Sequence, residues 1–141
     1  MGLILDTSVL VAEERGRFRL WDFCEAQFPE ALFITALTAS ELLHGVERAM
    51  PGPVRDRRRQ QVEGVIADFQ VLDFDLDVAR RHAAVWAHLT VAGTPIGPHD
   101  LLIAATALYH GFALATLNAS EFRRVPGLVL TEVQAFLVTP A

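Results

Sequence analysis

Four acidic or amide residues, Asp6, Glu41, Asp100 and Asn118, each occur where an apolar segment gives way to a loop or a helix start. The surrounding segments read LILDTSVL, TASELLHG, GPHDLLIAATAL and ATLNASEF. A carboxylate in such surroundings is costly to bury unless it pairs with a cation or coordinates one. No neighbouring residue offers that pairing at all of these positions. The sequence therefore favours one divalent metal ion shared between them.

Asp100 is the strongest single candidate. The helix expected after it, residues 101–108, is apolar on almost every side, which indicates a central position in the fold. The first turn of a helix is where free N–H groups and the macrodipole favour a carboxylate. A role as a helix cap explains Asp100 alone, but it does not explain the other acids, so we prefer the metal site.

Asp6 and Glu41 are more ambiguous when taken singly. Asp6 follows the first apolar strand, where hydrolases, phosphotransfer receivers and metal nucleases all carry an aspartate, and where a plain turn aspartate is also common. Glu41 lies one turn into a helix, an ordinary place for glutamate. With Asp100 they supply the hard oxygen ligands that Mg²⁺ or Mn²⁺ prefers. Zinc is disfavoured because His44 and His99 have no cysteine or close histidine partner.

Length and composition limit the class of protein. The chain has 141 residues, enough for one domain with a real core, and is 52% hydrophobic with a mean hydropathy of +0.31. This high hydrophobic content predicts a buried sheet and an apolar surface for partners. The longest apolar stretch, residues 101–117, is too short and interrupted for a membrane span. A lone Cys24 and the lack of a basic leader predict a cytoplasmic protein without membrane contact.

The charge pattern is unusual for a nucleic-acid binder. The net charge is -5 and the pI is about 5.4, although an acidic metal site contributes to both before a cation binds. All 12 basic residues are arginine, which excludes lysine-dependent mechanisms and favours guanidinium contacts with phosphate; biased genome composition also explains the lack of lysine. The dense run Arg55, Arg57, Arg58 and Arg59 is either a solvated helix face or a rim for RNA phosphates or an acidic partner.

Strands alternate with helices along the chain. The expected strands cover residues 3–5, 32–34, 71–74, 112–116 and 128–130. The expected helices cover 8–14, 19–28, 38–49, 54–69, 75–92 and 99–109, with a helical turn within 132–137. This order predicts a parallel sheet in an α/β sandwich, with ligands at the carboxyl ends of its strands. Asp6 and Asn118 should therefore face the same edge, and Ser8 should cap the first helix.

The chain resembles the PIN-domain ribonucleases, specifically the VapC-type toxins of bacterial toxin–antitoxin pairs. The resemblance runs essentially from end to end and is carried by LILDTSVLVA, ITALTASELLHGV and TPIGPHDLLIAATALYHGFALATLNASEFRRVPGLVL, of which the last is the most specific. It implies a single PIN domain over residues 1–141, built as a three-layer α/β/α sandwich with a central parallel sheet.

The resemblance also implies roles for the candidate residues. Asp6 and Asp100 are expected to be direct ligands of Mg²⁺, with Mn²⁺ as a substitute. Glu41 is expected to be a ligand directly or through water. Asn118 stands where many PIN domains carry a fourth acid, and is expected to position water or phosphate; nearby Glu121 could supply a carboxylate instead. Thr7 and Thr116 are candidate hydroxyls beside the site.

The activity implied is metal-dependent endonucleolytic cleavage of RNA by an activated water molecule, without a covalent enzyme intermediate. The implied partners are an RNA substrate, a cognate antitoxin that inserts a peptide near the acidic site, and a second copy of the chain in a homodimer. Six apolar residues are expected to be mostly core, with an antitoxin groove as the alternative: Val9, Leu10, Phe18, Leu20, Trp21 and Phe23.

Other functions fit the residues less well. A phosphatase with an aspartyl nucleophile at Asp6 usually needs a second aspartate two residues later, where Ser8 stands. A phosphotransfer receiver typically relies on a lysine, which the chain lacks. The remaining alternative is a non-catalytic PIN-like module that binds RNA or protein. The acids at 6, 41 and 100 count against it, because a binding site does not need metal-ligating carboxylates.

Overall fold

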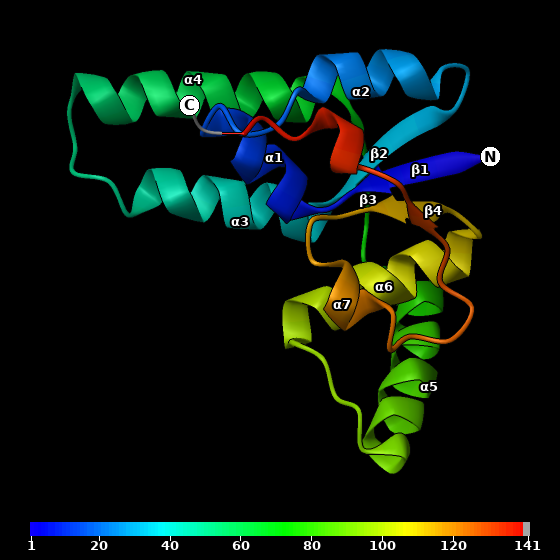
Figure 1. The fold of residues 1–141 in the computed structure, drawn as a ribbon. Helices are drawn as coiled ribbons and strands as arrows, with labels where there is room; N and C mark the ends of the chain where they lie inside the picture. Colours follow the sequence, from blue (N-terminus) through cyan, green and yellow to red (C-terminus); the bar gives the residue numbers. More distant parts are fainter. Residues whose placement is uncertain (140–141) are drawn as a thin grey trace.

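A single five-stranded sheet forms the centre of the molecule (Figure 1). The computed structural model describes residues 1–139, so the last two residues of the predicted domain 1–141 lie outside the described residues. The strand order is β3-β2-β1-β4-β5, and every neighbouring pair is parallel. The strands are β1 (Gly2–Leu5), β2 (Ala31–Thr35), β3 (Gln70–Leu72), β4 (Ala113–Ala115) and β5 (Leu130–Thr131). The predicted parallel sheet is confirmed.

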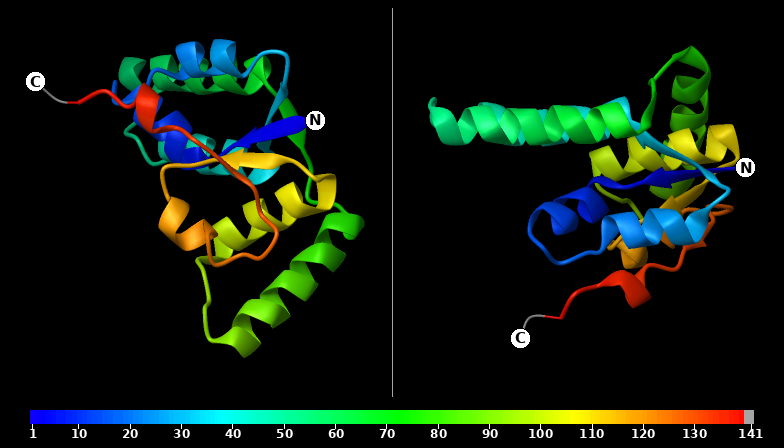
Figure 2. Two further views of the ribbon diagram at one scale, coloured as in Figure 1. Left: turned by 45° about the vertical axis from the view of Figure 1, so that its right-hand side comes forward. Right: turned by 90° about the horizontal axis from the view of Figure 1, so that it is seen from above.

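Helices cover both faces of the sheet. One side carries α1 (Thr7–Glu14), α2 (Leu20–Gln27), α3 (Ala36–Glu47) and α4 (Pro53–Asp68). The other carries α5 (Leu76–Ala92), α6 (Pro98–His110) and the short α7 (Ala119–Phe122) (Figure 1). The α3–α4 hairpin reaches beyond the sheet as an arm (Figure 2). These layers confirm the predicted α/β/α sandwich.

The central strand β1 explains the two-sided core. All of its residues are buried, and alternate side chains point to opposite faces of a strand. Leu3 and Leu5 pack with residues of α1 to α4, whereas Ile4 packs with residues of α5 and α6. Six apolar residues were expected to belong to the core, with an antitoxin-binding groove as the alternative. Five of them are buried, as expected for core residues: Val9, Leu10, Phe18, Leu20 and Phe23. Trp21 is the exception, since it is 51% exposed and stacks on Phe69.

Three local expectations differ from the structure. The short helix α7 was not predicted, and β5 begins two residues later than expected. Ser8 does not cap the first helix, because α1 begins at Thr7 and the extended Asp6 occupies the N-cap position. The Ser8 hydroxyl donates to the Asp6 carboxylate instead. Within residues 1–139, no helix is both long enough and apolar enough to cross a membrane.

Candidate active site

Asp6 is a buried carboxylate at the carboxyl end of β1. Its backbone N–H donates to the carbonyl of Ala115 at 2.9 Å, so the ends of β1 and β4 are joined directly. The side chain is only 3% exposed, and its Oδ2 accepts hydrogen bonds from Ser8 Oγ and Thr116 Oγ1, both at 2.7 Å. Burial raises the pKa of Asp6, and the two hydroxyls oppose that rise because they stabilise the ionised form.

Glu41 connects three helices at the same edge. Thr7 Oγ1, at the start of α1, donates to Glu41 Oε1 at 2.7 Å and also lies 2.9 Å from Thr38 Oγ1 on α3. His99 Nδ1, in the first turn of α6, lies 3.2 Å from Glu41 Oε2. Both oxygens of Glu41 therefore have a partner from another helix, which fixes the direction of the side chain.

Asp100 and Asn118 meet at the start of α6. Asn118 Nδ2 donates to Asp100 Oδ2 and to Glu121 Oε2, each at 3.0 Å. Glu121 Oε1 also accepts from the backbone N–H of Gly97. Asn118 is therefore a neutral donor between two carboxylates, at a place where an acid would repel both. Together with the Gly97 N–H, it lowers the pKa of Glu121.

The ionisation of Asp100 shows how close the acids lie to one another. Burial raises the pKa of Asp100 to about 6, with further contributions from repulsion by Asp6, Glu121 and Glu41. The hydrogen bond from Asn118 opposes this rise. A cation bound beside Asp100 would stabilise its ionised carboxylate, because attraction to the cation would offset repulsion by the other acids.

All four predicted site residues line one cavity of about 490 Å³: Asp6, Glu41, Asp100 and Asn118. Within residues 1–139, however, no three carboxylate, imidazole or thiol groups are arranged closely enough to hold a metal ion. Each carboxylate instead bonds a neighbouring hydroxyl, imidazole or amide. The donor chemistry, acidic oxygens that repel one another, fits a hard divalent cation. A shared ion requires some rearrangement of these side chains.

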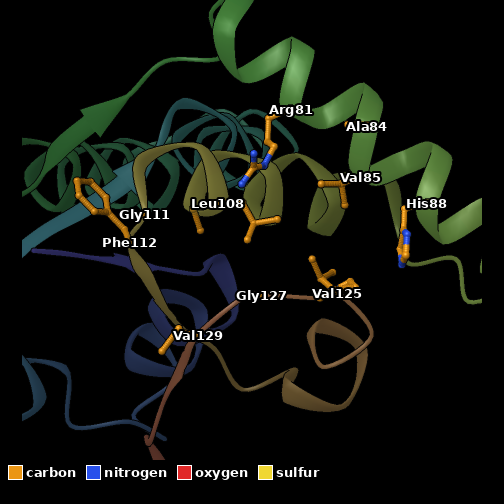
Figure 3. Close-up of a pocket in the computed structure, with 12 residues that line it drawn as sticks. Arg81, Ala84, Val85, His88, Leu108, Gly111, Phe112, Val125, Gly127 and Val129 are labelled. Atoms are coloured by element: carbon orange, nitrogen blue, oxygen red, sulfur yellow. The ribbon is translucent and has the colours of Figure 1, made fainter.

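A second cavity lies away from the acids, between α5, α6 and residues 125–129 (Figure 3). Its volume is about 430 Å³, and its lining is mostly apolar, as at Val85, Leu108 and Val125. Arg81 and His88 are its charged or titratable lining residues, and no carboxylate lines it. None of the four predicted site residues lines this second cavity.

Most of the predicted basic run is paired within the chain. Arg55 and Arg59 both contact Glu47, at 2.5 and 2.6 Å, and Arg58 lies 3.1 Å from Glu14. These contacts join α4 to α3 and to α1. They favour the interpretation of this run as a helix face over a rim for RNA.

Some residues of the site were missed from the sequence. Thr7 and Thr116 were expected nearby, and both donate to a predicted carboxylate. Ser8 was expected only as a helix cap. Arg15 and Arg17 line the acidic cavity but were not singled out. The sequence offered only a weak indication of their role, because it shows no more than two arginines, one on each side of Gly16, just after the helix that follows Asp6.

The pKa of Asp100 predicts how stability changes with pH. Because its folded-state value of about 6 lies above the ordinary 3.8, the folded state binds more protons between these values. The metal-free protein should therefore become more stable as pH falls from 7.5 to 5.5. Thermal unfolding in EDTA tests this. The rise should be reduced in Asp100→Asn, and an identical rise in that variant would assign it to another group.

Comparison with known proteins gives a consistent set of relatives. The family model described as PIN domain matches residues 3–128. The chain is 36% identical over 135 residues to Ribonuclease VapC1 of Rickettsia felis, covering 96% of this chain and 98% of that one. It is 37% identical over 95 residues to the tRNA(fMet)-specific endonuclease VapC of Salmonella typhimurium, covering 67% and 70%.

Solved structures show the same similarity. The DNA-bound VapBC complex from Salmonella typhimurium contains a chain that matches with a TM-score of 0.83 and 29% identity, over 93% of this chain and 97% of that one. A chain of FitAcB from Neisseria gonorrhoeae matches with a TM-score of 0.80 and 27% identity, over 92% and 96%.

Proposed function

Because the chain belongs to the PIN-domain family, and within it to the VapC ribonucleases, we propose that it is a metal-dependent endoribonuclease toxin neutralised by a cognate antitoxin. Its substrate is RNA, and its cofactor is Mg²⁺, for which Mn²⁺ can substitute. The observation that carries this proposal is the meeting of Asp6, Glu41 and Asp100 around one cavity. A module that only binds RNA or protein has no need of three acids that repel one another.

Each residue has a distinct task in the proposed reaction. Asp6 and Asp100 would hold the cation directly, and Glu41 directly or through water. When bound, the cation supplies positive charge beside the phosphodiester and lowers the pKa of a water molecule for in-line attack. The Asn118 amide would orient that water or a phosphate oxygen. Around these groups, the neighbouring hydroxyls fix the direction of the Asp6 and Glu41 carboxylates, and those of Ser8 and Thr116 stabilise the ionised form of Asp6.

The antitoxin and the homodimer are further parts of the proposal. The solved relatives include VapBC and FitAB complexes, which support an antitoxin partner. Exposed Trp21 borders a cavity of about 410 Å³ between α1, α2, α3 and α4. Its lining combines apolar residues with the acids Glu13, Glu14 and Asp68, and so offers a mixed apolar and acidic surface for a peptide. Exposed Trp86, Leu76 and Phe74 at α5 offer a separate apolar surface for a second copy of the chain.

The role of Asn118 gives a prediction about metal binding. Asn118→Asp replaces a donor between Asp100 and Glu121 with a third negative charge, so the metal-free protein should lose roughly 1–2 kcal/mol of stability. The stabilisation gained on adding Mn²⁺ should be larger than in the wild type. Thermal unfolding in EDTA and in Mn²⁺ measures both. Asn118→Ala is the control, since it removes the donor without adding charge; equal Mn²⁺ effects in both variants would contradict the prediction.

Incubation of purified protein with a total cellular RNA pool tests the proposed function. Cleavage at defined sites is expected in Mg²⁺ or Mn²⁺, with loss of cleavage in EDTA. A folded protein that binds Mn²⁺ and leaves every RNA of the pool intact would contradict the proposal and favour a non-catalytic binding module.

A further inference from the structure

Two arginines line the same cavity as the predicted metal ligands. Arg15 and Arg17 are both exposed, and both border the cavity that contains Asp6, Glu41 and Asp100. Among the residues that the structure describes, neither arginine side chain forms an ion pair or a hydrogen bond, although carboxylates line the same cavity. Three of the four arginines of α4, by contrast, are paired with glutamates. Arg15 and Arg17 are therefore available to an anion that enters the cavity.

The backbone holds both arginines on one fixed turn. Gly16 has a left-handed conformation with φ of 71°, and its N–H donates to the carbonyl of Glu13 at 2.9 Å. Arg17 N–H donates to the carbonyl of Ala12 at 2.7 Å, which completes a Schellman motif at the end of α1. The carbonyl of Arg17 accepts from the N–H of Val138 at 2.9 Å. Only the side chains are left to adjust to a ligand.

An RNA substrate needs such groups in this protein. The chain has a net charge of -5, and its acidic cavity repels the phosphates that it must admit. A bound cation would offset the negative charge of the scissile phosphate, but the neighbouring phosphates of the RNA strand would still need a positively charged partner. Guanidinium groups suit this task because they bind phosphate oxygens through two parallel hydrogen bonds.

We propose that Arg15 and Arg17 are positioning residues that bind RNA phosphates next to the scissile bond. This inference rests on the proposed function. It also identifies which side of the cavity holds the RNA strand. The carboxylates bind the cation, and Arg15 and Arg17 bind the phosphates on either side of the scissile bond. Affinity for RNA then depends on the turn at residues 15–17, while the rate of the chemical step depends on the carboxylates.

The test uses an RNA oligonucleotide that spans a site cut by the wild type. Arg15→Ala and Arg17→Ala should each raise KM about 10-fold, and the double variant about 100-fold, with kcat nearly unchanged. Binding of the same RNA is measured by fluorescence anisotropy in the Asp100→Asn background with EDTA, where no cleavage interferes. It should weaken by the same factors, and the slope of log K against log salt should fall by about 0.7 per lost contact.

Two matched variants complete the design. Arg81→Ala removes the same charge at the distant cavity of Figure 3, and should leave KM, kcat and the salt slope unchanged. Arg17→Lys keeps the charge without the paired hydrogen bonds, so it should restore the salt slope and recover only part of the affinity. A double variant that cuts and binds RNA like Arg81→Ala would overturn the inference and leave the proposed function intact. A wild type that neither binds nor cuts RNA would overturn both.

Discussion

Asp100→Asn should reduce RNA cleavage by on the order of 1,000-fold or more, and should also unfold at a higher temperature than the wild type in metal-free buffer. Cleavage is expected to be lost because one of the two proposed direct ligands of the cation is replaced by a neutral, weaker one. Stability rises because the pKa of Asp100 is raised to about 6 by burial and by repulsion from Asp6, Glu121 and Glu41. The amide removes that repulsion, and its oxygen can still accept from Asn118.

Opposite changes in activity and stability separate this result from simple misfolding. Cleavage rates in Mg²⁺ and thermal unfolding in EDTA should be measured on the same preparation. Glu63→Gln, on the exposed surface of α4, removes one negative charge away from the site and should change neither quantity. An Asp100→Asn protein that is inactive and also less stable than the wild type would show that Asp100 supports the fold. Full activity in this variant would show that the site is wrongly assigned.

Thr116→Val should lower activity by roughly 10- to 100-fold and stability by about 1–3 kcal/mol. The Thr116 hydroxyl donates to Asp6 Oδ2 at 2.7 Å and accepts from the backbone N–H of Asn118 at 2.9 Å. Valine has nearly the same shape, so the change removes these bonds without leaving a hole. The pKa of Asp6, already raised by burial, should rise further, because one of the groups that stabilise its ionised form is gone.

The pH dependence of this variant identifies the cause. A higher folded-state pKa of Asp6 means that stability is lost as pH rises, so the gap between Thr116→Val and the wild type should be larger at pH 8 than at pH 5. Unfolding by urea at both pH values measures the gap. Thr116→Ser keeps the hydroxyl and should recover most of the activity. A gap that is the same at both pH values would assign the loss to packing or to Asn118 alone.

The general architecture could be predicted because strong signals agreed with one another. Alternating strands and helices define a parallel sheet, and the carboxyl ends of neighbouring parallel strands must lie at one edge. The hydrogen bond from Asp6 to Ala115 shows this directly, because the residues that follow β1 and β4 meet there. The ends of α6 were also clear, with Pro98 at its start and Gly111 in a left-handed conformation at its end.

The details that could not be predicted depend on tertiary contacts. Helix α7 has four residues, too few to show a helical period. Ser8 was predicted to cap the first helix because serine is common at helix starts. Its hydroxyl instead donates to the buried Asp6 carboxylate. That Thr7 reaches Glu41, 34 positions away, depends on how α1 packs beside α3. The place of Arg15 and Arg17 beside the acids depends on a turn fixed by the distant Val138.

The most direct test of the carboxylate site is to cut one mapped RNA with a set of amide variants side by side. Asp6→Asn, Glu41→Gln and Asp100→Asn each remove one proposed metal-site carboxylate, and Glu63→Gln serves as the matched control. Cleavage at a single site is followed in Mg²⁺ and in EDTA. We expect the wild type and the control to cut only in Mg²⁺, and the Asp6 and Asp100 variants to lose cleavage. The Glu41 variant should be at least strongly impaired. Cleavage at the wild-type rate by any of the three, or cleavage that persists in EDTA, would contradict the assignment of a shared metal site.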